Sequence, residues 1–192
     1  MNGVEKGPDG KPRCPWALGT PDYIAYHDSE WGHPLHGESE LFERLTLEAF
    51  QSGLSWLTIL RKRENFRKAF DRFDIERVAA YGAKDVKRLM GDAGIVRNRK
   101  KIDAAIANAR AARELHAAGE TLDGLVWSFA PDPKTRPAPR AGEDIPAITD
   151  ESTALSKELK QQGFVFVGPT TAYATMQAAG LVNDHLAACA FR

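Results

Sequence analysis

Two cysteines and two histidines, divided between the ends of the chain, restrict its fold more than any other feature. Cys14 precedes His27 by thirteen residues, and His185 precedes Cys189 by four. Thiolate sulfur and imidazole nitrogen are the donors of tetrahedral Zn²⁺ sites, and i, i+4 spacing on a helix directs two donors to one point. The pattern predicts one structural zinc ion that joins segment 14–27 to segment 185–189 of an already globular chain.

The same spacing is compatible with two alternatives. Either the four side chains are ordinary buried thiols and hydrogen-bonded imidazoles that happen to be neighbours, or Cys14 and Cys189 form a disulfide. The start of the chain shows no secretory signal, and no apolar run approaches the ~20 residues that span a bilayer. We therefore expect a cytoplasmic protein without a membrane partner, in which both thiols stay reduced.

Length and charge limit the class of protein. At 192 residues the chain is long enough to bury an ordinary hydrophobic core. Its 26 basic and 26 acidic side chains give a formal net charge of zero, so any surface for nucleic acid has to be local. Two basic clusters are candidates, although such runs are more often solvated helix faces. They are Arg61, Lys62, Arg63, Arg67 and Lys68, and Arg97, Arg99, Lys100 and Lys101.

Apolar residues recur at helical spacing along most of the chain, and we expect an all-α fold. Residues 1–12 are rich in Gly, Pro and charge and should form a flexible tail, followed by a single domain over residues 13–192. Five prolines between residues 131 and 146 predict an irregular excursion. One helical region is expected from near residue 38, with a hinge at 52–53, and another helix after the cap Asp74. Further helices are expected over 84–92, from the cap Asn98 to about 118, over 149–162 and over 170–180.

A helix-hairpin-helix arrangement is predicted around residues 85–110. Its turn is Gly94-Ile95-Val96-Arg97, where Gly94 can take the left-handed conformation of a helix exit and the two apolar residues can anchor the turn to the core. The free N–H groups at the start of the next helix can bind a phosphate without reading sequence, and Arg97 and Arg99 add positive charge. An ordinary tight turn between packed helices is the alternative.

Aromatic side chains gather around one acidic residue. Trp16, Tyr23, Tyr26, Trp31 and Trp56 lie within about forty residues of each other, and Glu48 belongs to an apolar helical segment just before Trp56. Each aromatic residue alone is more often a core residue, and Glu48 alone fits a surface acid. As a group they predict a flat pocket for a positively charged nucleobase, in which an amino group of the base offsets the desolvation of the carboxylate.

Several sequence segments together resemble the 3-methyladenine DNA glycosylase I family, also called the Tag type. The resemblance extends over about residues 12–190. The matching segments are Arg13-Cys14-x-Trp16, Tyr23-Ile24-Ala25-Tyr26-His27-Asp28-x-Glu30-Trp31-Gly32, Leu47-Glu48, Gly53-Leu54-Ser55-Trp56, Lys62-Arg63-Glu64-Asn65, Asp92-Ala93-Gly94-Ile95, Val126-Trp127-Ser128-Phe129, Gly163-Phe164-x-Phe166-Val167-Gly168 and Gly180-Leu181-Val182-Asn183-Asp184-His185 with Cys189.

The resemblance implies a helix-hairpin-helix glycosylase that flips a nucleotide out of double-stranded alkylated DNA and releases free 3-methyladenine by hydrolysis. It implies a structural zinc ion on Cys14, His27, His185 and Cys189. It assigns Glu48 as the catalytic residue, and Tyr26, Trp56, Tyr23, Trp31 and Trp16 as the residues around the base. The implied DNA contacts are the wedge Gly53 and Leu54 and the hairpin residues Gly94, Ile95, Val96, Arg97 and Arg99. We expect a monomer.

Two other functions are compatible with parts of this pattern. A zinc-dependent nucleobase deaminase would need His-x-Glu and Pro-Cys-x-x-Cys segments and an open coordination position, and the chain has no Pro-Cys-x-x-Cys segment. A non-catalytic sensor of alkylated DNA would use the same aromatic residues and the same acid. The sequence therefore disfavours the deaminase and does not separate the glycosylase from the sensor.

Overall fold

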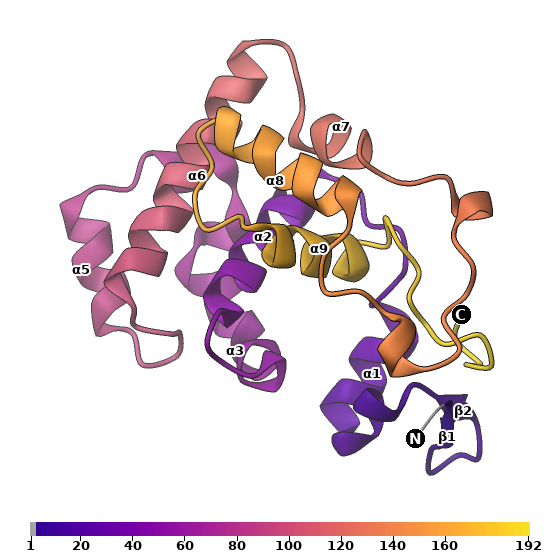
Figure 1. The fold of residues 1–192 in the computed structure, drawn as a ribbon. Helices are drawn as coiled ribbons and strands as arrows, with labels where there is room; N and C mark the ends of the chain where they lie inside the picture. Colours follow the sequence, from indigo (N-terminus) through magenta and orange to yellow (C-terminus); the bar gives the residue numbers. More distant parts are fainter. Residues whose placement is uncertain (1–2) are drawn as a thin grey trace.

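The computed structural model describes residues 3–192, and within this range the chain is mostly helical, as the sequence predicts (Figure 1). The α-helices are α1 Pro21–Ser29, α2 Glu38–Gln51, α3 Trp56–Ala69, α4 Ile75–Ala79, α5 Ala83–Gly91, α6 Arg99–Ala117, α7 Leu122–Trp127, α8 Asp150–Gln161 and α9 Pro169–Ala178. Short 3-10 turns are η1 Pro15–Gly19, η2 Asp71–Phe73, η3 Pro133–Thr135 and η4 Gly142–Asp144, and the strands are β1 Glu5–Lys6 and β2 Pro12–Arg13.

Side-chain caps fix the start of several helices. The Asn98 side chain accepts a hydrogen bond from the Lys101 N–H at 3.2 Å, and Asp74 accepts one from Arg77 N–H at 3.0 Å, so both predicted caps are confirmed. Between α7 and α8, the proline-containing segment 131–146 forms two short 3-10 turns and otherwise irregular backbone, as expected.

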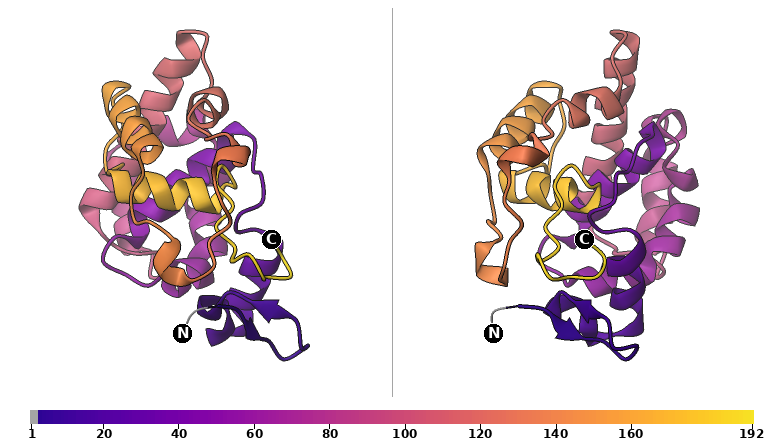
Figure 2. Two further views of the ribbon diagram at one scale, coloured as in Figure 1. Left: turned by 45° about the vertical axis from the view of Figure 1, so that its right-hand side comes forward. Right: turned by 90° about the vertical axis from the view of Figure 1, so that its right-hand side faces the viewer.

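Helix α2 lies near the centre of the molecule and contacts α3, α6, α7 and α9 (Figures 1 and 2). Its apolar side chains join a large hydrophobic core in which Phe42, Phe50, Phe66 and Phe70 are completely buried. A second, smaller cluster gathers where the N- and C-terminal segments meet, around Cys14, Tyr26, Trp31, Leu186 and Cys189. Trp56 and Ile145 pack against both clusters. The space between the two clusters is where the candidate site lies.

A small β-hairpin replaces part of the expected tail. Strands β1 and β2 pair antiparallel, and Arg13 at the end of β2 is only 3% exposed. Its guanidinium donates to Asp9 at 2.5 and 2.9 Å and to Asp28 at 2.7 to 3.1 Å. These ion pairs order residues that look flexible by composition, and the partner Asp28 belongs to α1. Residues 1 and 2 of the expected tail lie outside the described residues.

No helix in the described part of the chain is both long and apolar enough to span a membrane.

Candidate functional site

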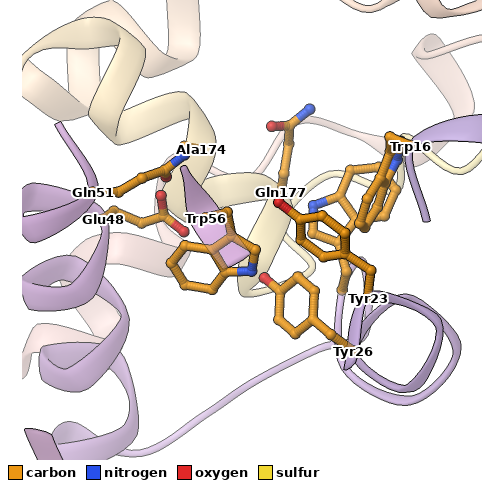
Figure 3. A pocket seen from close by; sticks show the side chains of 9 residues that line it. Trp16, Tyr23, Tyr26, Glu48, Gln51, Trp56, Ala174 and Gln177 are labelled. Atoms are coloured by element: carbon orange, nitrogen blue, oxygen red, sulfur yellow. The ribbon is translucent and has the colours of Figure 1, made fainter. Parts of the chain in front are cut away.

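A pocket of ≈ 190 Å³ opens between α1, α2, α3 and α9 (Figure 3). All five predicted aromatic residues and the predicted acid line it, although they come from four separate parts of the chain. Three further lining residues were not predicted. The complete lining is Trp16, Tyr23, Tyr26, Trp31, Glu48, Gln51, Trp56, Ala174 and Gln177.

The aromatic walls are held by local structure on α1 and α3. Tyr23 and Tyr26 are three residues apart and therefore share one face of α1. The Tyr23 hydroxyl accepts a hydrogen bond from the Leu57 N–H at 3.1 Å, which ties α1 to the start of α3. Trp56 is the first residue of α3, after the cap Ser55, and its ring centroid lies 5.3 Å from that of Tyr26 at 48°. Tyr26 and Trp56 thus bound a slot for a planar group.

Trp16 and Trp31 form the other end of the pocket. Their ring centroids are 5.0 Å apart in an edge-to-face arrangement, and Trp16 also packs edge-to-face on Tyr23 at 5.7 Å. Trp16 is 37% exposed, whereas Trp31 is 8% exposed. Trp16 therefore lies at the rim, and Trp31 connects the pocket to the smaller hydrophobic cluster.

Glu48 brings a nearly buried carboxyl group into this pocket. The residue is 6% exposed, and its side chain makes no hydrogen bond to any of residues 3–192. Burial raises the pKa of Glu48 to about 7, against the opposing effect of the Arg44 charge one turn earlier on α2. A carboxylate here has lost its hydration without gaining a donor, so a ligand that carries an amino group or a positive charge would satisfy it.

Arg44 is not a partner of Glu48 because it is paired with Glu30. The Glu30 carboxylate accepts from Arg44 at 2.7 Å and from Arg63 at 2.5 and 2.8 Å. Although burial alone would raise the pKa of Glu30, the hydrogen bonds from Arg63 and Arg44 hold it at about 2. The cluster joins α1, α2 and α3, and places the Arg44 guanidinium 5.5 Å from the ring centroid of Tyr26. It fixes one side of the aromatic slot.

The four predicted metal ligands converge in the smaller cluster. All four side chains are buried, and one donor atom from each lies within 4.8 Å of the others. The distances include 3.9 Å from Cys14 Sγ to His185 Nδ1, 3.6 Å from Cys189 Sγ to His27 Nε2, and 3.0 Å between the two imidazole nitrogens. Cys14 and Cys189 are free thiols, so the disulfide alternative is wrong.

The second nitrogen of each imidazole has its own partner. His27 Nδ1 lies 2.8 Å from Asp28 Oδ1, and His185 Nε2 lies 2.8 Å from the Trp31 carbonyl oxygen. These contacts leave His27 Nε2 and His185 Nδ1 directed toward the two thiols, the arrangement that orients histidine ligands in metal sites. The donor set therefore fits one metal ion, and through Trp31 the cluster is attached directly to the pocket wall.

The predicted hairpin turn between α5 and α6 is present, but one prediction about it is wrong. Gly94 does not have a positive φ. A side chain would instead be crowded by its surroundings, because an added Cβ would lie 2.9 Å from Asp92 Oδ1 and 3.1 Å from Asn65 Cβ. Lys62 of α3 donates to the carbonyl oxygens of Ala93 and Gly94 at 3.0 and 3.2 Å. Close packing against α3, rather than backbone conformation, accounts for glycine at this position.

The turn leaves backbone donors and positive charge at the start of α6. In the part of the chain that the structure describes, the N–H groups of Arg97 and Arg99 donate to no protein acceptor. Both side chains are exposed, although Arg99 is paired with Asp103 at 2.8 Å. Ile95 is 2% exposed and anchors the turn, with Val96 packed against the same core. This combination is suited to a phosphate group.

Lys101 does not belong to this exposed basic cluster. It is 8% exposed, and its Nζ donates to the carbonyl oxygens of Phe50 at 2.8 Å and Ser52 at 2.5 Å. Burial lowers the pKa of Lys101. The turn that it holds contains Gly53, with φ +80°, and Leu54, which is 41% exposed. The predicted wedge therefore projects from a turn that is fixed at its base.

Comparison with known proteins identifies the family of the chain. Residues 16–192 match the family model described as methyladenine glycosylase. The DNA-3-methyladenine glycosylase 1 of Escherichia coli (strain K12) is 51% identical over 178 residues, 92% of this chain and 95% of that protein. The DNA-3-methyladenine glycosylase of Haemophilus influenzae (strain ATCC 51907 / DSM 11121 / KW20 / Rd) is 44% identical over 92% of this chain and 96% of its own length.

Solved structures agree with the fold as well. A crystal structure of 3-methyladenine DNA glycosylase I (TAG) superposes with a TM-score of 0.87 at 48% identity, covering 93% of this chain and 98% of that one. A TAG structure from Staphylococcus aureus, solved to explain 3-methyladenine recognition, superposes with a TM-score of 0.86 at 38% identity, with coverages of 93% and 95%. By its sequence and its fold, the chain belongs to the methyladenine glycosylase family.

Proposed function

We propose that the protein is a DNA glycosylase that hydrolytically removes 3-methyladenine from alkylated double-stranded DNA. The observation that carries this proposal is the nearly buried Glu48 carboxyl group, which faces an aromatic slot and has no donor among residues 3–192. The relatives named above as DNA-3-methyladenine glycosylases support the same activity. Free 3-methyladenine and an abasic DNA strand would be the products, and we propose that a single domain over residues 13–192 acts as a monomer.

The charge of the substrate explains why so few catalytic groups are needed. Methylation at N3 gives the adenine a formal positive charge while it is still attached to the sugar. The glycosidic bond is weakened and the base departs as a neutral molecule, so a general acid is not required to protonate it. The protein has to extrude the nucleotide, at a cost of a few kcal/mol, and then hold the base in a pocket.

The pocket would prefer the charged base through two kinds of contact. The faces of Tyr26 and Trp56 would stack on the ring, contributing on the order of 1–3 kcal/mol for the base, and electron-rich faces favour a cation. Tyr23, Trp31 and Trp16 would complete the wall. Ionised Glu48 would accept a hydrogen bond from the exocyclic amino group of the base. Neutral adenine gains less from both contacts, which gives discrimination against undamaged DNA.

The DNA would be held outside the pocket by two surface turns. The start of α6, with Gly94, Ile95, Val96, Arg97 and Arg99, acts in this proposal as the hairpin of a helix-hairpin-helix motif and binds a backbone phosphate. The turn with Gly53 and Leu54 would place an apolar side chain in the gap that the flipped nucleotide leaves. Exposure of Leu54 and its location three residues after Gln51 of the pocket support this role.

The metal cluster would hold one structural Zn²⁺. Two thiolates and two imidazoles are a common ligand set for structural zinc, and four protein ligands leave no position for a reactive water. When bound, the ion supplies cross-linking rather than reaction chemistry. His27 follows Tyr26 directly, and the Trp31 carbonyl accepts a hydrogen bond from His185. The bound ion would therefore keep the side chains of Tyr26 and Trp31 in place.

An assay for the released base tests the proposal and separates it from a DNA-damage sensor. Methylated duplex DNA is incubated with the protein, and free 3-methyladenine is measured by chromatography with mass detection. We expect release well above the spontaneous rate in buffer, together with equal amounts of abasic sites. Binding to methylated DNA without release above buffer would contradict the enzyme and identify a sensor.

A further inference from the structure

The loop between α8 and α9 carries an exposed apolar pair that the proposed site does not use. Val165 and Phe166 are 42% and 43% exposed, whereas Phe164 and Val167 on either side are buried. Phe166 also has a φ of 58°, in the left-handed region that is unfavourable for a bulky residue. Strain of this kind persists only where the surrounding structure imposes it, and it is concentrated at functional sites.

Two buried side chains impose the conformation of this loop. Asn108 of α6, 1% exposed, donates to the Val165 carbonyl oxygen at 3.0 Å and accepts from the Val165 N–H at 2.8 Å. Ser156 of α8 donates to the Val167 carbonyl oxygen at 2.6 Å. The backbone on both sides of Phe166 is therefore fixed, and the aromatic side chain is kept at the surface instead of in the core.

Helix α6 holds the Leu54 turn in the same manner. Lys101 and Asn108 are seven residues apart, so they share one face of α6 and are separated by about 10 Å along its axis. Lys101 binds the backbone that precedes Leu54, and Asn108 binds the backbone that precedes Phe166. One helix thus supports two loops that each expose an apolar side chain, and Figures 1 and 2 show the α8–α9 loop running beside α6.

The neighbours of the loop point to DNA as its partner. The supporting helix α6 begins at the hairpin turn, where unpaired N–H groups and Arg97 are suited to phosphate. The helix that follows the loop, α9, contributes Ala174 and Gln177 to the base pocket. The loop is thus attached to α6, which the proposed function assigns to the duplex, and leads into α9, which lines the pocket for the flipped base.

We propose that Val165 and Phe166 form a second apolar contact with the duplex, beside the Leu54 wedge. Phe166 would pack on the sugars and base edges of nucleotides a few steps from the flipped one, as apolar residues of other DNA-bending proteins do in the minor groove. This inference rests on the proposed glycosylase function, because it places the DNA across the mouth of the same pocket. The hydrogen bonds of the buried Asn108 and Ser156 side chains would keep the loop rigid for this contact.

The test compares two substitutions by asparagine. Phe166→Asn removes the apolar contact, and asparagine tolerates the left-handed conformation. Ile148→Asn is the control, because Ile148 is 48% exposed and precedes α8, at the opposite end of that helix from the loop. Affinity for a duplex with a tetrahydrofuran abasic analogue is measured by fluorescence anisotropy. We expect Phe166→Asn to weaken duplex binding about tenfold and Ile148→Asn to leave it unchanged.

Further measurements separate this inference from folding and from the proposed function. Free 3-methyladenine binding, followed by tryptophan fluorescence, should be the same in both variants and the unaltered protein. Phe166→Gly relieves backbone strain without restoring the contact, and it should bind the duplex as weakly as Phe166→Asn. Duplex affinity equal to that of the unaltered protein in both Phe166 variants, with normal melting, would overturn the inference. Failure of the unaltered protein to release the base would instead count against the proposed function.

Discussion

Glu48 has to meet two conflicting demands. As an ionised group it would bind a cationic base, but burial raises its pKa to about 7 and favours the neutral form. In the unfolded chain the pKa of Glu48 would be near 4.5. Between about pH 4.5 and pH 7, the folded protein therefore keeps a proton on Glu48 that the unfolded chain has already released. Folding stability should therefore decrease as the pH rises from about 4.5 to about 7.

Glu48→Gln should separate these two demands. The amide cannot ionise, so we expect the variant to be more stable than the unaltered protein at pH 8, by up to roughly 3 kcal/mol, and similar to it at pH 5. Release of 3-methyladenine should fall at least about tenfold because the charged acceptor is lost. Urea denaturation at both pH values and the base-release assay provide the measurements.

A suitable control for this variant is Glu114→Gln, on the exposed surface of α6. The Glu114 side chain is 73% exposed, and no function is proposed for it. It should change neither the pH dependence of stability nor base release. A Glu48→Gln protein with normal release would remove Glu48 from the proposed reaction, and equal stability at pH 8 would contradict the raised pKa.

At the scale of secondary structure, the turn between α2 and α3 shows how a single buried lysine can support a surface loop. The Nζ of Lys101 donates to two carbonyl oxygens at the end of α2, just before the exposed Leu54. These carbonyl groups are near the negative end of the helix dipole of α2, where a cation is favourable. The lysine thereby joins α6 to the turn that carries the proposed wedge residue Leu54.

Lys101→Met should release the α2–α3 turn while keeping most of the apolar volume. Without the two hydrogen bonds, amide hydrogens of residues 52–55 should exchange at least about tenfold faster, and stability should fall by about 1–3 kcal/mol. Hydrogen exchange with mass detection measures the first effect and urea denaturation the second. Lys100→Met, at the exposed neighbouring position, should show neither change. Unaltered exchange in the turn would mean that Lys101 does not support it.

The sequence predicted elements better than the interactions between them. Periodicity and capping residues placed α6 and α8, because these signals are local. The inward direction of Lys101 was missed, since it depends on carbonyl groups about fifty residues earlier. Gly94 was explained by the wrong cause for the same reason, because an added Cβ would be crowded by Asn65 of α3 as well as by the neighbouring Asp92.

The pocket residues, too, were predicted from local signals and missed where only long-range packing places them. Its aromatic residues and Glu48 occur in recognisable segments near the start of the chain, so the sequence alone is enough to group them. Ala174 and Gln177 were not predicted, because α9 reaches the pocket only through the packing of the whole fold. Their spacing of three residues places both on one face of α9, but nothing local shows which cavity that face meets.

At the scale of the whole molecule, the four candidate metal ligands bring the N-terminal and C-terminal segments together. Cys14 and Cys189 belong to the smaller hydrophobic cluster, and the contact of His185 with the Trp31 carbonyl links the ligand set to the pocket. Because the larger core does not include these residues, the metal should contribute to stability without being necessary for helix formation.

Removal of the metal should therefore lower the melting temperature more than the reaction rate. After treatment with a strong chelator, we expect melting at least about 5 °C lower, restored by added Zn²⁺, as scanning calorimetry can show. Base release well below the new melting temperature should persist in large part. A metal-free protein that melts normally but releases no base would contradict a structural role for the ion.

The distribution of the four ligands also sets an order of events during synthesis. His27 and His185 are separated by 158 residues, so a growing chain on the ribosome carries half of the ligand set long before the other half exists. All nine α-helices of the described part are translated between Cys14 and His185. The helical core can therefore form before all four side chains are available to hold a metal ion.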